Sequence, residues 1–156
     1  MQINLGMPIE VRVKTLIFYK EKGIAIILLE DLGGAWGLPI LAKATEVSSI
    51  LFSLEGENPP RPLSHDLIAN IVAGLKARVL HVLIDILEEP ICHGIVAVEL
   101  KEKEIDFDAR PSDAISLALR AHVPIYVSAA VVNKGAVPFS QQDWAEDLEG
   151  KTKLQN

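Results

Sequence analysis

Two short segments of the chain combine residue types that bind phosphate and move protons. Residues 61–66 read Arg-Pro-Leu-Ser-His-Asp, and residues 110–113 read Arg-Pro-Ser-Asp. In each segment an arginine precedes a predicted helix start, a serine can cap that helix, and an aspartate falls in its first turn. Helix N-termini present unpaired N–H groups and the positive end of the helix dipole, so they hold anions readily. Both segments therefore indicate a site for an anion such as phosphate.

The charged and titratable side chains of these segments suggest separate roles. Arg61 and Arg110 carry planar guanidinium groups that can hold a phosphate through paired hydrogen bonds. His65 titrates near neutral pH, so it can act as a general acid or base. The two segments thus supply both phosphate donors and a proton carrier.

Three carboxylates could add a metal ion. Asp66 and Asp113, together with Glu46 from the preceding helix, offer oxygen ligands to a hard divalent cation such as Mg²⁺ or Mn²⁺. A bound phosphate, a metal ion and a proton carrier are together the parts of a phosphodiesterase. Serine caps and first-turn aspartates also stabilise helices by about 1 kcal/mol each without further function. A purely structural role for these residues therefore stays open.

The totals describe one compact aliphatic domain. Among 156 residues, 49% are hydrophobic, 23% charged and only 5% aromatic, which is typical of a globular protein rather than a disordered tail. No apolar run reaches membrane-spanning length, and the N-terminus lacks the pattern of a secretion signal. The single cysteine, Cys92, excludes an internal disulfide and a multi-cysteine zinc site. We therefore expect a cytoplasmic protein without a membrane partner.

The net charge restricts any contact with nucleic acid. The formal charge at pH 7 is −6, and no basic cluster occurs along the chain. Because neutralisation of phosphates supplies much of the affinity of nucleic-acid-binding proteins, we expect any such binding to be weak, local or assisted by a metal ion.

Alternating polar and apolar residues, and an unbroken aliphatic run in residues 24–29, predict strands in two groups. The first group forms an antiparallel meander over residues 9–19, 24–29 and 35–41. The second forms a consecutive antiparallel meander over residues 78–87, 91–100 and 104–109, with Ile105 and Phe107 pointing inward. A short last strand is predicted over residues 125–127. Strand groups separated by isolated helices indicate the α+β class.

Helical spacing predicts three main helices and one short one. The main helices are expected over residues 45–54, 64–76 and 112–122, the last two capped by Ser64 and Ser112. A capping-box sequence at residues 140–143 predicts a short helix in the polar C-terminal tail. In the second helix, the residues expected to face the core are Leu67, Ile68, Ile71, Val72 and Leu75.

The order of these motifs resembles the bifunctional nuclease family. The likeness rests on residues 38–40, Glu46, residues 61–67, residues 106–114 and residues 124–127, and it covers about residues 9–132. Residues 1–132 are identified as a bifunctional-nuclease-like domain, and residues 133–156 as a polar C-terminal extension with a short helix. The resemblance implies an α+β fold with antiparallel, strongly bent sheets, and assembly into a homodimer or a higher homo-oligomer.

The resemblance also implies a metal-dependent nuclease activity on DNA or RNA and a set of site residues. The implied catalytic residues are Glu46, His65, Asp66 and Asp113; the implied phosphate-binding residues are Arg61, Arg110 and Ser112; the implied ligands of Mg²⁺ or Mn²⁺ are Glu46, Asp66 and Asp113. The chain departs from the family pattern at two positions near the first helix. Lys43 stands where a glycine is usual, and Ser48 where an acidic or polar residue is frequent.

Three functions therefore remain open from the sequence. The first is a metal-dependent phosphodiesterase acting on nucleic acid, in which case the protein is an enzyme. The second is a non-catalytic module that binds a small anion or nucleotide at the same helix starts, and the third is an oligomeric scaffold. The acidic net charge and the scarcity of aromatic stacking residues count against the first.

Overall fold

The computed structural model describes residues 6–57, 59–88 and 91–139 of the chain, and every structural statement below concerns these ranges. The strands, in chain order, are β1 (Ile9–Tyr19), β2 (Ile24–Asp31), β3 (Trp36–Lys43), β4 (Arg78–Glu88), β5 (Ile91–Leu100), β6 (Lys103–Ala109), β7 (Ile125–Val127) and β8 (Val137–Pro138). The α-helices are α1 (Ser48–Glu55), α2 (Ser64–Gly74), α3 (Pro111–Ala121) and α4 (Ala129–Gly135). No helix in the described ranges is long and apolar enough to cross a membrane.

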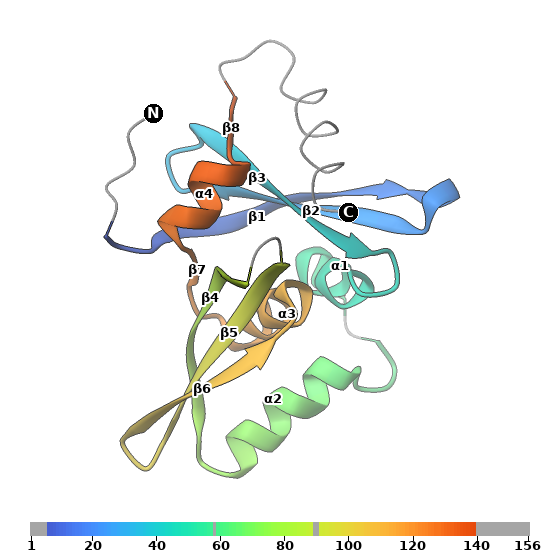
Figure 1. Cartoon of the computed structure of the whole chain (residues 1–156). Helices are drawn as coiled ribbons and strands as arrows, with labels where there is room; N and C mark the ends of the chain where they lie inside the picture. The colour runs from blue at the N-terminus through green and yellow to red at the C-terminus, as the bar shows by residue number, and fades with distance from the viewer. Residues whose placement is uncertain (1–5, 58, 89–90, 140–156) are drawn as a thin grey trace.

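All the strands join one sheet with the order β6-β5-β4-β7-β1-β2-β3-β8. Both predicted meanders are confirmed, because β1–β2–β3 and β4–β5–β6 pair consecutively and antiparallel. The short strand β7 connects them: it pairs antiparallel with β1 and parallel with β4 (Figure 1). The prediction of purely antiparallel, strongly bent sheets is therefore wrong, since the sheet is mixed and is not strongly curled.

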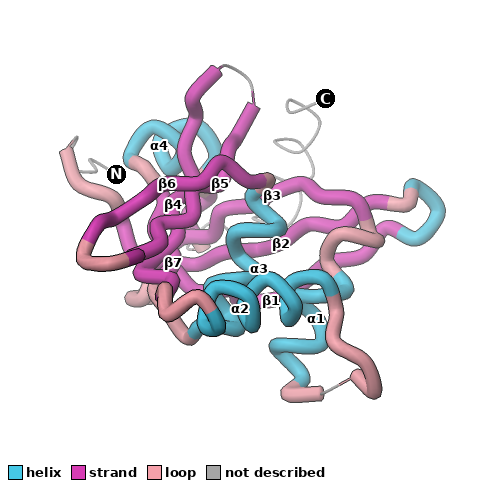
Figure 2. Tube along the Cα trace, turned by 90° about the horizontal axis from the view of Figure 1, so that it is seen from below, coloured by secondary structure: helices cyan, strands magenta, loops and turns pink. Residues whose placement is uncertain are grey.

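Helices α1, α2 and α3 lie together on one side of the sheet (Figure 2). Helix α3 is the most deeply packed of the three, with Ala114, Ile115 and Ala118 fully buried against β4 and β5. Strand β2 is central in the first half of the sheet, and residues 25–29 are buried without interruption. Strand β2 and helix α3 therefore contribute many of the core residues. The second Arg-Pro segment stands at the start of α3, so the core fixes its position.

Three helix starts differ from the predicted ones. Helix α2 begins at Ser64 with Leu63 as its N-cap residue, so Ser64 does not cap it. Helix α1 begins at Ser48 rather than at Thr45, and α3 begins at Pro111 with Arg110 as its N-cap residue, so Ser112 lies inside the helix instead of capping it. Proline suits the first helical position because its missing N–H would be unpaired there. The proline, and not the serine, therefore fixes where α3 begins.

The chain beyond residue 132 contains structure that periodicity does not predict. Helix α4 spans residues 129–135 across the predicted domain boundary, and β8 pairs with β3. The Ser128 hydroxyl accepts a hydrogen bond from the N–H of Val131 and caps α4. A helix of two turns is too short to display a helical period in the sequence. The short helix predicted from Ser140 lies outside the described residues.

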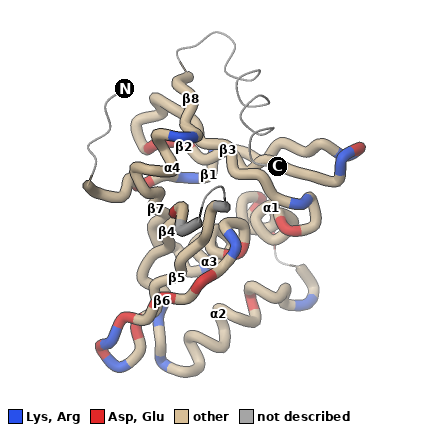
Figure 3. Tube along the Cα trace, in the orientation of Figure 1, with Lys and Arg blue, Asp and Glu red and all other residues tan. Residues whose placement is uncertain are grey.

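The predicted inward face of α2 is largely exposed. Leu67, Ile71 and Leu75 are 55%, 52% and 65% exposed, and no residue of α2 is buried. On β6, Ile105 and Phe107 are also half exposed, contrary to the prediction that they point into the core. Figure 3 shows few charged residues along α2. The exposed apolar side chains on and next to α2 and on β6 are called here the α2–β6 face: Leu67, Ile68, Ile71, Leu75, Ile105 and Phe107.

Candidate functional site

A cleft of about 990 Å³ is lined by α2, strands β5 and β6, and the starts of α1 and α3. Its larger part is apolar and includes Val72, Val98 and Phe107. Its polar end is lined by residues that the sequence places far apart: Glu46, Ser49, His65, Arg110 and Asp113. A cleft that combines apolar walls with a few convergent polar groups is the usual form of a ligand site.

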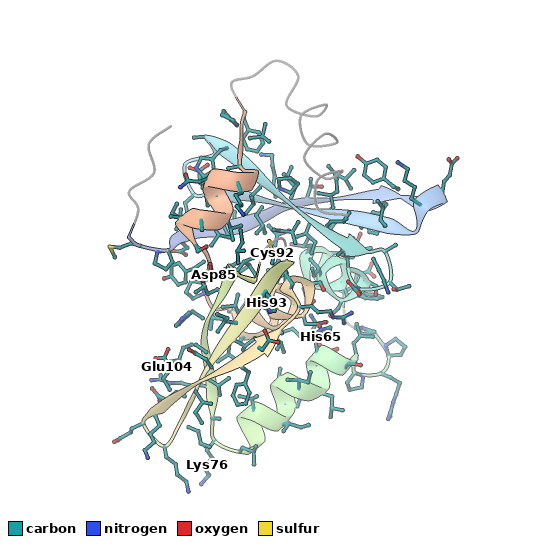
Figure 4. All side chains as sticks on the ribbon, in the orientation of Figure 1. His65, Lys76, Asp85, Cys92, His93 and Glu104 are labelled. Atoms are coloured by element: carbon teal, nitrogen blue, oxygen red, sulfur yellow. The ribbon has the colours of Figure 1, made fainter. Side chains whose placement is uncertain are left out.

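His65 is the centre of the polar end. It lies in the first turn of α2 (Figure 4), where Nδ1 is 2.9 Å from Oγ of Ser49 and Nε2 is 2.9 Å from Oδ1 of Asp113. Ser49 comes from the first turn of α1 and Asp113 from the first turn of α3. Three helix starts therefore meet at one imidazole, and both of its nitrogens are occupied.

Arg110 neutralises two of the carboxylates in this cluster. Its Nε lies 2.7 Å from Oδ2 of Asp113, its Nη2 lies 3.1 Å from Oδ1, and its Nη1 lies 2.5 Å from Oε1 of Glu46. Burial raises the pKa of Asp113, but the hydrogen bonds from Arg110 and His65 outweigh it and hold that pKa below its ordinary value. Asp113 is thus an ionised carboxylate that orients both the arginine and the imidazole.

Asp66 belongs to a second, separate ion pair. It accepts hydrogen bonds from Nε of Arg120 and, at 2.7 Å, from the N–H of Leu63. Burial opposes ionisation of Asp66, yet these two hydrogen bonds keep its pKa below the ordinary value. Asp66 and Arg120 line a smaller cavity of about 410 Å³ and do not line the cleft. The ion pair therefore fixes the start of α2 against the end of α3.

The remaining predicted phosphate ligands lie elsewhere. Arg61 is exposed on the connection between α1 and α2 and lines neither of the two cavities. Ser112 is only 2% exposed and does not line the cleft. Of the sequence-predicted residues, the structure gathers Glu46, His65, Arg110 and Asp113 and leaves Arg61, Asp66 and Ser112 outside this group.

The metal set predicted from the sequence does not fit a single ion in this arrangement. Within residues 6–57, 59–88 and 91–139, no group of three or more His, Cys, Asp or Glu side chains lies close enough to hold a metal. Asp66 faces Arg120, while Glu46 and Asp113 both face Arg110. A cation bound by Glu46 and Asp113 would have to displace the guanidinium. The Mg²⁺ or Mn²⁺ site stays a prediction.

Ser49 in the site and Arg120 beside it have no counterpart in the sequence-based prediction. Ser49 is 5% exposed, lines the cleft and contacts His65. Arg120 joins three helices, because besides Asp66 its guanidinium reaches the carbonyl oxygen of Ser49 at 3.2 Å and Oγ of Ser53 at 2.9 Å. Asp113 and Arg120 are seven residues apart on one helix, which places them on one helix face. This seven-residue spacing is the sequence pattern that indicates Arg120. No pattern in the sequence indicates Ser49.

Comparisons with known proteins place the chain in a family. Residues 26–140 match the family model described as the bifunctional nuclease domain. Two proteins of Mycobacterium tuberculosis, uncharacterized protein MT1877 of strain CDC 1551 / Oshkosh and uncharacterized protein Rv1829 of strain ATCC 25618 / H37Rv, are each 36% identical to the chain over 123 residues. Each alignment covers 79% of this chain and 73% of the relative. The chain belongs to the bifunctional nuclease domain family.

Proposed function

We propose that the protein hydrolyses phosphodiester bonds of DNA or RNA at the polar end of the cleft, with His65 carrying the proton. The observation that supports this most strongly is the contact of His65 with both Ser49 and Asp113, beside Arg110. An imidazole held by a carboxylate is the usual arrangement of a general acid–base group. The description of the matching family as a nuclease domain supports the choice of a phosphodiester.

Arg110 is the candidate phosphate ligand. Its side chain is 60% exposed, so its Nη1 side can exchange Glu46 for a substrate phosphate while its Nε side keeps Asp113. A guanidinium that holds a phosphate through paired hydrogen bonds would stabilise the charge that develops during cleavage. Because the chain has a net charge of −6 and this contact neutralises a single phosphate, we expect nucleic acid to bind weakly and with only a shallow dependence on salt.

The apolar part of the cleft suits the bases rather than the phosphates. Phe107 is 50% exposed and lines the cleft, together with aliphatic side chains of α2 and β5. Stacking of a base on an aromatic ring contributes about 1–3 kcal/mol and needs an unpaired base. We therefore expect single-stranded substrates to be cleaved faster than duplexes.

The alternative is a non-catalytic module that binds a nucleotide in the same cleft. The ion pairs of Arg110 with Glu46 and Asp113 favour this alternative. They already stabilise the folded chain, so a catalytic role is not needed to explain these residues. The two functions differ in outcome. A binding module would be stabilised by nucleotides in thermal unfolding and would cleave nothing.

The deciding experiment measures cleavage of single- and double-stranded DNA and RNA by the purified protein and two histidine variants. We expect His65→Ala to lower the rate by about 10²–10⁴-fold, the usual contribution of a general acid–base group. His93→Ala is the matched control: His93 also contacts an aspartate, Asp108, at 3.0 Å, but it does not line the cleft. Equal activity of the wild type and His65→Ala would reject the assignment of His65, and an inactive wild type would favour the binding module.

A further inference from the structure

Both ring nitrogens of His65 are engaged, and this restricts what the imidazole can do. The carboxylate of Asp113 at Nε2 can only accept a hydrogen bond while it is ionised, so Nε2 carries the proton of the neutral ring. Nδ1 is then an acceptor, and the hydroxyl of Ser49 donates to it at 2.9 Å. In this tautomer the proton nearest to the basic nitrogen is that of Ser49.

We infer that Ser49 is the nucleophile of the site, activated by His65 and oriented through it by Asp113. A serine, a histidine and a carboxylate in hydrogen-bonded series form the arrangement that activates a hydroxyl in many unrelated hydrolases. The assignment of Ser49 depends on the two contact distances of 2.9 Å and on the position of Ser49 in the cleft wall. The choice of a phosphate ester as the substrate rests on the proposed function.

The surroundings of Ser49 suit a fixed nucleophile. Its carbonyl oxygen accepts hydrogen bonds from Arg120 at 3.2 Å and from the Ser53 hydroxyl at 3.2 Å, which hold the backbone of α1 in place. Its neighbour Ser48 donates to the carbonyl oxygen of Thr45 at 3.0 Å, whereas Ser49 contacts His65. The two adjacent serines therefore differ in the one contact that activates a hydroxyl.

The reaction would proceed in two balanced halves. In the first, Ser49 Oγ attacks phosphorus and gives its proton to His65 Nδ1, the bond from phosphorus to one nucleoside oxygen breaks, and that oxygen leaves with the proton from His65. In the second, water attacks the phosphoserine ester and gives a proton to His65, and the Ser49 oxygen leaves phosphorus and takes that proton back. Neither half needs an oxidant or a reductant.

The test uses diisopropyl fluorophosphate, which reports an activated serine without any nucleic acid. Ser49 Oγ would replace fluoride on phosphorus with loss of hydrogen fluoride, and mass spectrometry of peptides would locate the added group. We expect labelling of Ser49 in the wild type and in Ser48→Ala. In His65→Ala we expect the rate of labelling to fall by at least about 10²-fold. Labelling of Ser48 instead, or labelling of Ser49 that His65→Ala leaves unchanged, would overturn the inference.

A second measurement separates this inference from the proposed function. Labelling of Ser49 in a protein that cleaves no nucleic acid would support the nucleophile and reject the phosphodiester substrate. Cleavage of nucleic acid without labelling of Ser49, or full cleavage by a Ser49→Ala variant, would reject the nucleophile and leave His65 to activate water. Because the wild-type labelling needs no variant, a folding defect of Ser49→Ala, checked by circular dichroism, cannot obscure the result.

Discussion

Asp113 and His65 are 48 residues apart in the sequence, and Oδ1 of Asp113 lies 2.9 Å from Nε2 of His65. The contact joins the first turn of α3 to the first turn of α2. The Arg120–Asp66 ion pair joins the same start of α2 to the other end of α3. Because two contacts fix α2 against α3, the imidazole has a defined position over the cleft although no residue of α2 is buried.

We expect Asp113→Asn to lower cleavage by about 10²–10⁴-fold, as loss of an oriented general base does. An amide can donate to Nε2, which would move the ring proton to Nδ1 and prevent acceptance from Ser49. The unfolding free energy should fall by about 1–3 kcal/mol, since hydrogen bonds to a charged group are lost. Denaturant unfolding and single-turnover cleavage measure the two effects. Full activity with the same loss of stability would assign Asp113 a structural role only.

Arg110→Gln tests where a divalent cation binds. The guanidinium now neutralises Glu46 and Asp113, so its removal should free two carboxylates and strengthen Mn²⁺ binding relative to the wild type. The same substitution should weaken substrate binding, because it removes the phosphate ligand. Isothermal titration with Mn²⁺ and with a short oligonucleotide measures both. Mn²⁺ binding that is weaker in the variant would mean that the cation does not compete with Arg110.

Gly94→Ala should disturb the site, because Gly94 lies against the start of α3. A Cβ at Gly94 of β5 would lie 2.9 Å from the carbonyl oxygen of Arg110 and 2.7 Å from the Cβ of Ala114. We expect the start of α3 to shift, with a loss of about 1–3 kcal/mol in unfolding free energy from overpacking and a lower cleavage rate. Gly74→Ala is the control, since nothing lies within 4 Å of the added Cβ and alanine favours a helix by about 0.5–1 kcal/mol. Similar effects of the two substitutions would contradict the close approach.

Most strands could be predicted from the sequence, because alternation marks β1 and an unbroken apolar run marks β2, whereas β8 with its two residues shows no period. The alternation in residues 9–19 correctly predicts β1, although a bulge between Val13 and Thr15 shifts its register so that Leu16, and not Thr15, packs toward the core. A bulge adds one residue to a strand, and no residue type announces it. The burial of α2 was predicted wrongly, because periodicity shows that one face of a helix is apolar but not whether another element covers that face.

The site could be predicted only where residues carry a local signal. His65 and Arg110 stand in the two Arg-Pro segments, each of which combines an arginine, a serine and an aspartate at a helix start, so the sequence predicts both as site residues. Ser49 becomes part of the site only because α1 and α2 both pack against α3, and the sequence around Ser49 resembles any helix start. Asp66 has the same local signal as Asp113, yet it faces Arg120 because a first-turn residue can point to either side of a helix start. Tertiary packing decides between them.

The unfolding free energy should fall in acid because of Glu30. Glu30 is only 5% exposed in β2. Hydrogen bonds from Lys14 and Arg12 hold its pKa below the ordinary value, although burial opposes this. A carboxylate whose pKa is lower in the folded chain stabilises fully above its unfolded pKa, about 4.3 for glutamate, and this stabilisation is lost as pH falls through the folded pKa.

Glu30→Gln checks this assignment. At pH 7 we expect the variant to be less stable by about 1.5–3 kcal/mol, the range for hydrogen bonds to charged groups. Urea unfolding between pH 7 and pH 3 should show a smaller loss of stability in the variant than in the wild type. Glu10→Gln, on the exposed side of β1, should leave both values nearly unchanged. The same acid dependence in Glu30→Gln and wild type would assign the effect to other carboxylates.

The exposed side chains Leu67 and Ile71 of α2, which do not line the cleft, should be covered by a second copy of the chain. Exposed large apolar side chains that lie together on one helix favour a protein–protein contact, and Phe107 in the cleft stays available to a base. Pairing of the β6 edges themselves is disfavoured, because it would bring together strands that carry Glu104, Asp106 and Asp108. We therefore expect the helices α2 to meet across a twofold axis, in keeping with the homo-oligomer predicted from the sequence.

Light scattering coupled to size-exclusion chromatography tests the dimer. At micromolar concentration we expect twice the chain mass of 17.0 kDa for the wild type and 17.0 kDa for Ile71→Glu, whose charge would be buried at the centre of the interface. Leu32→Glu is the matched control, because Leu32 is 54% exposed but lies in the turn between β2 and β3, away from the α2–β6 face. A wild-type mass of 17.0 kDa would contradict the dimer. A dimer that persists in Ile71→Glu and dissociates in Leu32→Glu would move the interface to the other end of the sheet.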